Sequence, residues 1–163
     1  MIAQIMRYCQ NYFSRTYENK ELVFDSAGKT ITGVAKTYKA GQYICVRFSY
    51  LNDGVYTVTG YDSENGVITV SESLTDETDT CQIFGLAVPT DFVLLVAEIT
   101  SWITNNSPDG VANEKIDDYS IAYSAYAQKV GWQGAYKGKL AQYRKMYCDL
   151  DWTVETYVTR ELL

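Results

Sequence analysis

The sequence contains no histidine, and this absence excludes several kinds of site at once. Neither a Ser/His/Asp nor a Cys/His catalytic set can be assembled, and the side chain that most often serves as acid or base near neutral pH is missing. The cysteines form no CxxC pair, so zinc-site spacing is absent too. We expect no structural metal, no cofactor, and reduced, buried thiols at Cys9, Cys45, Cys81 and Cys148.

Phosphate-binding loops and membrane segments are also missing. Neither GxxxxGK[ST] nor GxGxxG occurs. The longest apolar run, Phe92 to Ala97, is far too short to cross a bilayer. The start, Met1 to Cys9, lacks the cationic region and apolar run of a signal peptide. We expect a protein that is made in the cytoplasm and is neither secreted by that route nor inserted in a membrane.

Acidic residues in the middle of the chain are the remaining candidates for catalysis, because a glycosidase uses a pair of carboxylates. These residues are Asp53, Asp62, Glu64, Glu72, Asp76 and Glu77. Most of them flank predicted turns, where acidic side chains commonly serve solubility and bind the backbone. We therefore expect that the protein is not an enzyme.

Basic residues are absent between Phe48 and Glu114, a stretch with eleven acidic residues. The flanking segments are basic: Met1 to Arg47 holds seven basic and three acidic residues, and Lys115 to Cys148 holds six and two. Copies placed side by side can bring an acidic flank against a basic one. The alternative is an acidic surface that only keeps the domain soluble.

Tyrosine is in surplus, with fifteen in 163 residues. Its ring and hydroxyl suit a surface that becomes buried against a partner, although a β-rich core rimmed by tyrosine would have the same composition. The length fits one domain, or a small domain with an insertion. An apolar content of 47% with 21% charged residues is typical of a globular protein.

The periodicity of apolar residues changes along the first half of the chain. Helical spacing predicts an amphipathic helix from Met1 to about Arg15. From Leu22 to about Leu86, β-branched and aromatic runs alternate with turn signals such as Asn65-Gly66. Five or six short strands of this kind predict a small antiparallel barrel or rolled sheet.

A second helix is predicted after Pro89, capped by Thr90 or Asp91 and ending near Asn105. Its apolar stripe consists of Leu94, Leu95, Ile99, Trp102 and Ile103. A polar loop then leads to Ile116 to Ser124, which we expect to be one extended segment.

A third helix is predicted from about Ala125 to Cys148. Its aromatic face consists of Trp132, Tyr136, Leu140, Tyr143 and Tyr147. The opposite stripe of small residues consists of Ala127, Gly131, Gly134, Gly138 and Ala141, and continues to Lys145. Because glycine in a helix costs about 1 kcal/mol relative to alanine, we expect the stripe to admit another backbone, from the same subunit or from a neighbouring copy. Alternatively, Gly131 and Gly134 break the segment, and a shorter helix starts near Trp132.

This third helix carries five basic residues and no acidic one. They are Lys129, Lys137, Lys139, Arg144 and Lys145. Such a helix can touch phosphates, or it can dock on the acidic middle section of an adjacent copy. The isoelectric point of about 4.6 argues against a freestanding nucleic-acid binder, while non-specific contact with DNA in an assembled channel stays open.

The predicted fold is α+β: a small bundle of about three helices with an antiparallel β-barrel-like module inserted between the first and second helices. Residues 1–21 and 89–148 form the helical core, and residues 22–88 form the inserted module. The remaining residues, 149–163, form an arm that orders only on a neighbour. The apolar side chains of this arm include Trp152, Val154, Tyr157 and Val158.

Three sequence segments occur in the order VPTDFVLLVAEITSWI, EKIDDYSIAYS and LAQYRKMY. This order resembles the head-tail connector proteins (adaptor or head-completion proteins) of long-tailed bacteriophages, in which an E-x-I-G-D-Y-S-like segment precedes the last helix and a Tyr-Arg pair lies near its end. Asp117 stands where that family has glycine. The matching residues are Glu114, Ile116, Asp118, Tyr119, Ser120, Tyr143 and Arg144.

The resemblance implies a structural protein of the virion neck. Family members form a ring, typically of twelve copies, under the portal protein at the capsid vertex. That ring extends the DNA channel and offers a platform for the stopper or tail-completion protein. The resemblance also implies that the arm formed by residues 149–163 docks on the portal.

Two alternatives stay open at this stage. The first is a stopper or tail-completion ring protein in which the β section provides the ring contacts. The second is a small β-barrel module that binds peptide or single-stranded nucleic acid.

Overall fold

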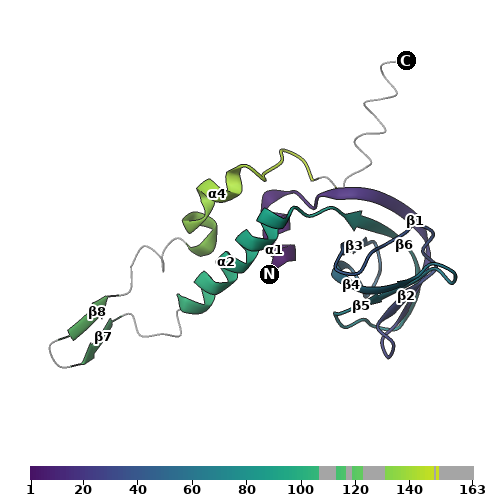
Figure 1. Cartoon of the computed structure of the whole chain (residues 1–163), viewed down its shortest axis with the longest axis horizontal. Helices are drawn as coiled ribbons and strands as arrows, with labels where there is room; N and C mark the ends of the chain where they lie inside the picture. The colour runs from purple at the N-terminus through teal and green to yellow at the C-terminus, as the bar shows by residue number, and fades with distance from the viewer. Residues whose placement is uncertain (107–112, 117–118, 123–130, 149, 151–163) are drawn as a thin grey trace, which may run out of the picture. The chain divides into compact units, whose positions relative to one another are not determined.

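The computed structural model describes residues 1–106, 113–116, 119–122, 131–148 and 150 (Figure 1). The chain divides into two compact units. The first, here called the helical unit, combines Met1–Cys9 with the described residues of Pro89–Lys145. The second, here called the barrel unit, comprises Gln10–Val88 and the described residues after Lys145.

Six strands of the barrel unit close into an antiparallel barrel in the order β1-β2-β5-β4-β3-β6 (Figure 1). The strands are β1 (Ser14–Asp25), β2 (Thr30–Thr32), β3 (Tyr43–Arg47), β4 (Gly54–Asp62), β5 (Val67–Val70) and β6 (Glu77–Leu86). The longest pairing joins β1 to β6 and runs from Ser14↔Leu86 to Phe24↔Glu77. The predicted α+β class and the predicted small antiparallel barrel are therefore confirmed.

The interior of the barrel follows from alternation along the strands. On β1, Leu22 and Phe24 are buried while Glu21, Val23 and Asp25 are exposed, because successive side chains of a strand point to opposite faces. The same core contains Ile31, Ile44, Val46, Val58, Ile68, Val70 and Ile83. Each of these large side chains contributes about 1.5–3 kcal/mol when fully buried.

The first helix is shorter than predicted, and the first strand is longer. Helix α1 (Ile2–Cys9) ends where Gln10 adopts a positive φ of 53°. The Phe13 carbonyl accepts a hydrogen bond of 2.8 Å from the Ala87 amide, and Ser14 pairs with Leu86. The helix predicted to reach Arg15 is thus wrong beyond Cys9, because pairing with β6 holds these residues extended.

The segment that follows β2 is held on the barrel by a buried acidic side chain. Gly33 turns the chain with a φ of 107°, and a Cβ there would lie 2.8 Å from the Glu21 carbonyl oxygen. Glu18 of β1, only 7% exposed, then accepts hydrogen bonds from two amides and from the Tyr38 hydroxyl. The barrel core contains Tyr38 for this reason.

In the helical unit, α2 (Thr90–Asn105) ends where predicted but begins differently. The N-cap is Pro89 in an extended conformation, without a side-chain cap. Asp91 lies in the first turn rather than at the cap. The buried residues of α2 are Phe92, Leu95, Val96 and Ile99. Leu94, a member of the predicted apolar stripe, is 67% exposed.

The predicted continuous third helix is wrong within the described residues. Residues 131–135 are helical, Tyr136 interrupts them with φ −106° and ψ 9°, and α4 (Lys137–Ala141) follows. Gly131 has a φ of 59°, a left-handed conformation that glycine adopts without a Cβ penalty. The alternative of a break followed by a shorter helix near Trp132 is closer to the structure.

The segment predicted as one extended stretch contains a strand of a hairpin instead. Strands β7 (Asn113–Ile116) and β8 (Tyr119–Ala122) are antiparallel, and the terminal pairs are Asn113↔Ala122 and Ile116↔Tyr119. Ile116 therefore ends one strand, while Tyr119 begins the other. Sequence alternation alone did not show that the chain reverses between them.

Candidate functional site

The Tyr-Arg pair that follows α4 anchors the end of the helical unit. The Tyr143 hydroxyl donates a 2.6 Å hydrogen bond to Asp91 Oδ2. Its ring meets Phe92 edge-on, with the centroids 5.0 Å apart. The hydrogen bond to Asp91, together with burial, raises the pKa of Tyr143 to about 12. Tyr143 thus fastens this segment to the first turn of α2.

Arg144 extends the same cluster toward α1. Its guanidinium carbon lies 5.2 Å from the centroid of the Tyr8 ring, a cation–π arrangement. The Tyr8 ring in turn meets Trp132 edge-on, with the centroids 5.3 Å apart. The Lys145 amide donates a 2.9 Å hydrogen bond to the Cys9 carbonyl. Aromatic and backbone contacts therefore join α1 to the residues after α4.

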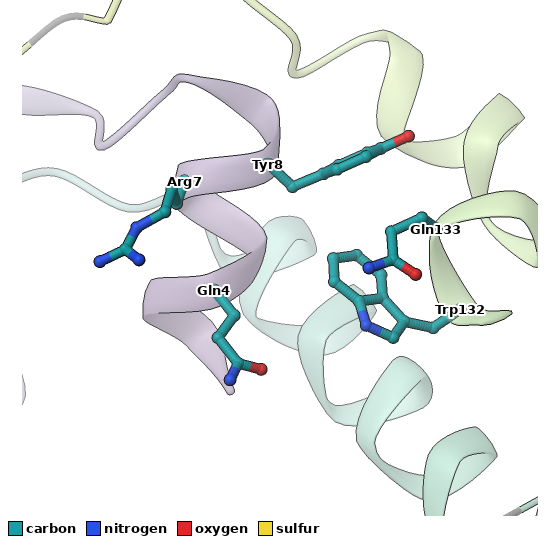
Figure 2. A pocket seen from close by; sticks show the side chains of 5 residues that line it. All are labelled: Gln4, Arg7, Tyr8, Trp132 and Gln133. Carbon is teal, nitrogen blue, oxygen red and sulfur yellow. The ribbon is translucent and has the colours of Figure 1, made fainter.

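An open pocket lies beside this cluster, within the helical unit. It has a volume of about 430 Å³ and is lined by Gln4, Arg7, Tyr8, Trp132 and Gln133. Figure 2 shows the Tyr8 and Trp132 rings projecting toward each other from α1 and the 131–135 segment, while the Arg7 side chain points away from both rings. None of these lining residues is acidic. We call this feature the Tyr8–Trp132 pocket.

The predicted small-residue stripe is not one face of a continuous helix. Gly131 and Gly134 are partly buried, whereas Gly138, Ala141 and Lys145 are exposed. A Cβ added at Gly138 would meet no described atom within 4 Å. Gly138 therefore packs against no other backbone of the described subunit. The remaining member, Ala127, lies outside the described residues.

The family-motif residues fall in two places of the helical unit. Glu114, Ile116, Tyr119 and Ser120 lie on the β7–β8 hairpin, where Ile116 pairs with Tyr119 and Lys115 with Ser120. Tyr143 and Arg144 belong to the cluster just described. Asp118 lies outside the described residues, as do the residues predicted for portal docking, Trp152, Val154, Tyr157 and Val158.

A second candidate surface was not predicted: the loop between β3 and β4. Its apolar side chains are largely exposed, with Phe48 at 61%, Tyr50 at 90% and Leu51 at 53%. We call these three residues the barrel tip. In the sequence Phe48 and Tyr50 belong to a β-type run, QYICVRFSY, so periodicity assigned these two residues to a strand.

Glu77, at the start of β6, holds the barrel tip in place. Its carboxylate accepts hydrogen bonds from the amides of Tyr50 and Leu51, at 2.8 and 3.1 Å. It also accepts the Ser49 hydroxyl and the Asn52 side-chain amide, each at 2.6 Å. Burial opposes the ionisation of Glu77, but these donors outweigh it and lower its pKa.

The backbone of the barrel tip is strained at Phe48, which has a φ of 63°. A bulky residue rarely adopts this left-handed conformation, and such strain tends to persist at functional positions. The Arg47 guanidinium carbon lies 5.2 Å from the Phe48 ring centroid. The exposed ring is therefore presented in a defined position.

Two other acidic residues of the barrel, Asp62 and Glu72, accept hydrogen bonds from neighbouring turns and strands. Asp62 Oδ1 accepts hydrogen bonds from the Glu64 and Asn65 amides, and Oδ2 accepts one from the Asn65 side chain. Glu72 accepts the Thr57 amide and hydroxyl, each at 2.8 Å. The hydrogen bonds from Asn65 and Glu64 lower the pKa of Asp62, whereas a glycosidase acid needs a raised one.

All four cysteines are free; Cys9, Cys45 and Cys81 are buried, and Cys148 is partly buried. The predicted burial of the thiols is therefore confirmed for Cys9, Cys45 and Cys81 and is partial for Cys148. Within the described residues, no three Cys, Asp or Glu side chains gather in a way that could hold a metal ion. No described helix has the length and apolarity needed to cross a membrane.

Comparison with family models, with curated proteins and with solved structures gave no match for this chain.

Proposed function

We propose that this chain is a head-tail connector adaptor of a tailed bacteriophage, assembled as a ring of twelve copies beneath the portal protein. In this proposal the helical unit is the connector core, and the barrel unit is a module inserted between its first and second helices. The protein would lie in the neck of the virion, where it extends the DNA channel and links the capsid to the stopper or tail-completion protein.

The observation that carries the proposal is the placement of the family-motif residues. The segment with Glu114, Ile116 and Tyr119 forms a hairpin between α2 and the closing helical segment, which is the place that the family order assigns to it. Tyr143 and Arg144 follow α4 and contact α2 and α1. Each residue of the Tyr-Arg pair therefore contacts a helix of the same unit, Tyr143 contacting α2 and Arg144 contacting α1.

Charge also supports assembly from identical copies. The barrel unit from Phe48 to Val88 carries seven acidic residues and no basic one. Basic side chains of the helical unit, including Lys137 and Lys145, are exposed. Opposite potentials on two parts of one chain favour head-to-tail contacts between copies, and these close into a ring when the rotation closes.

The deciding experiment mixes the purified chain with the portal protein of the same phage and examines the product by native mass spectrometry and electron microscopy. A ring bound to the portal supports the proposal. An unassembled chain that ignores the portal, or virions that lack the chain at the neck, would refute it. A purified monomer alone decides nothing, since such rings can close only on the portal.

A stopper or tail-completion role is the second candidate, and the barrel tip favours it because that surface belongs to the β section. Deleting residues 22–86 with a short linker separates the two roles. An adaptor keeps its binding to the portal without the barrel. A stopper shows no binding to the portal after this deletion, while its helical unit stays folded; loss of the ring alone does not separate the two roles.

A further inference from the structure

The barrel tip combines exposure with rigidity. Tyr50, at 90% exposure, and its neighbours Phe48 and Leu51 are three of the eight large hydrophobic residues found exposed in the described chain. Their loop is nonetheless fixed, because Glu77 binds the Tyr50 and Leu51 amides. A preorganised apolar surface loses little conformational freedom when it binds. These features are those of a docking element rather than of a solvated loop.

The Tyr8–Trp132 pocket has complementary properties. Its volume of about 430 Å³ lies within the usual range of roughly 300–1,000 Å³ for binding pockets. Arg7 lines it, and the Arg144 guanidinium lies over the Tyr8 ring. The lining of the pocket thus contains two aromatic rings, Tyr8 and Trp132, with two arginines beside them.

The charges around the two features are opposite. From Phe48 to the end of the barrel at Val88, seven acidic residues occur without a basic one, and Asp53 accepts a hydrogen bond within the tip loop itself. Nucleic acid is disfavoured as an occupant, because the carboxylates of Asp53 and Glu77 lie at the tip loop and would repel its phosphates. A protein surface with an aromatic, cationic recess fits better, and this chain carries one.

We propose that the barrel tip of one copy docks into the Tyr8–Trp132 pocket of a neighbouring copy. In this contact Tyr50 and Leu51 meet the Tyr8 and Trp132 rings, and Arg7 and Arg144 face Asp53 and Glu77 of the tip region. The inference rests on the proposed ring function and names the contact between its copies. Because tip and pocket are different surfaces, the contact is heterologous, as a ring requires.

Two variants remove the two sides of this contact without touching a buried residue. The tip variant is Tyr50→Ser with Leu51→Ser; its control, Val23→Thr, changes an exposed apolar residue elsewhere on the barrel. The pocket variant is Arg7→Glu with Gln133→Glu, both exposed lining residues. Its control makes the same change of charge at exposed Arg15 and Asn19 of β1. Circular dichroism verifies that each variant is folded.

Self-association is measured by analytical ultracentrifugation and native mass spectrometry over a concentration series, with and without the portal protein. We expect the tip variant and the pocket variant each to associate at least tenfold more weakly than wild type, and both controls to match wild type. Mixed together, the two variants should form heterodimers that stop there, because the mixture retains one intact tip and one intact pocket. Raising the salt concentration should weaken wild-type association.

Rings of the tip variant on the portal would overturn this inference and leave the proposed function standing. Two weakly associating variants that fail to complement each other would also overturn it. Wild-type self-association that needs the tip but ignores the portal would retain the inference and refute the adaptor role. A wild-type chain that stays monomeric in both settings would refute both. Oligonucleotide binding lost in the tip variant, with self-association unchanged, would assign the tip to nucleic acid instead.

Discussion

The barrel unit should depend strongly on Glu18, the buried acidic residue of β1. Its Oε2 accepts the Ala35 amide at 2.7 Å, and its Oε1 accepts the Lys36 amide at 3.0 Å and the Tyr38 hydroxyl at 2.9 Å. All three neighbours are donors, so an ionised carboxylate satisfies each of them. Replacing Glu18 removes the acceptor that ties the segment after β2 to the barrel wall.

The expected loss follows from what each donor can do without Glu18. Ala35 and Lys36 are exposed, so water can replace the carboxylate at their amides, and each lost bond lowers the free energy of unfolding by about 1 kcal/mol. The Tyr38 hydroxyl is buried, at 3% exposure for the residue, and leaving such a group unsatisfied costs about 1–3 kcal/mol. Removing a buried charge offsets part of this. We therefore expect Glu18→Ala to destabilise the barrel by about 3 kcal/mol.

Glu18→Gln separates hydrogen bonding from side-chain volume. The amide oxygen can still accept from Lys36 and Tyr38, but the NH₂ group then faces the Ala35 donor, so we expect about half the effect of alanine. The exposed Glu21 of the same strand provides the control, because Glu21→Ala should change stability by less than about 0.5 kcal/mol.

Urea unfolding followed by circular dichroism measures these differences, and hydrogen exchange assigns them to the barrel unit. A Glu18→Ala protein whose free energy of unfolding lies within about 0.5 kcal/mol of wild type, the range of an ordinary surface change, would refute the reasoning. Equal losses in Glu18→Ala and Glu21→Ala would refute it as well, since the effect would then be unrelated to the buried hydrogen bonds.

Four further outcomes are expected. Burial, followed by the hydrogen bond to Glu18, raises the pKa of Tyr38 above its ordinary value of 10.0. The free energy of unfolding of the barrel, measured by urea titration, should therefore fall as pH rises above 10 in wild type, and should fall less in Tyr38→Phe. The pKa of Glu77 is lowered from 4.5, so its contribution to the stability of the tip loop is complete above pH 4.5 and is lost as pH falls through the folded-state value. In hydrogen exchange, the protection of the wild-type tip amides should then fall toward that of Glu77→Gln, which lacks this titration. Tyr143→Phe loses the bond to Asp91 and should destabilise the helical unit by about 1 kcal/mol in thermal unfolding; no change would contradict the anchoring role. Gly138→Ala should raise helix stability by about 1 kcal/mol. Gly138→Leu should leave circular dichroism unchanged and impair assembly or portal binding, and normal assembly of this variant would show that Gly138 does not lie in the interface.

Local sequence signals were sufficient for the barrel and for α2. The strands from Leu22 onward alternate in polarity or are apolar, and turn residues such as Gly66, with a φ of 62°, separate them. Helix α2 combines a preceding proline with an apolar face of period 3.6. These signals depend on neighbours within a few residues, which a single sequence contains.

Contacts between distant residues decided the elements that were predicted wrongly. The first part of β1, from Ser14 to Lys20, is polar and becomes a strand only because β6 pairs with it. The third helix breaks at Tyr136, whose buried ring packs edge-on against Trp102 of α2, with the centroids 6.2 Å apart. Neither partner is near in the sequence, so periodicity favoured a longer first helix and an unbroken third one.

For the candidate surfaces too, some features are evident from the sequence and others only from the tertiary structure. The sequence by itself determined the charge segregation, the missing histidine and the Tyr143-Arg144 pair, since these are properties of composition and order. Only the tertiary structure decided that Phe48, Tyr50 and Leu51 are exposed, because Glu77 reaches their loop from the start of β6. It likewise decided that Tyr8 and Trp132 share one pocket, because α1 and the residues before α4 come together only when the helical unit packs around its own core.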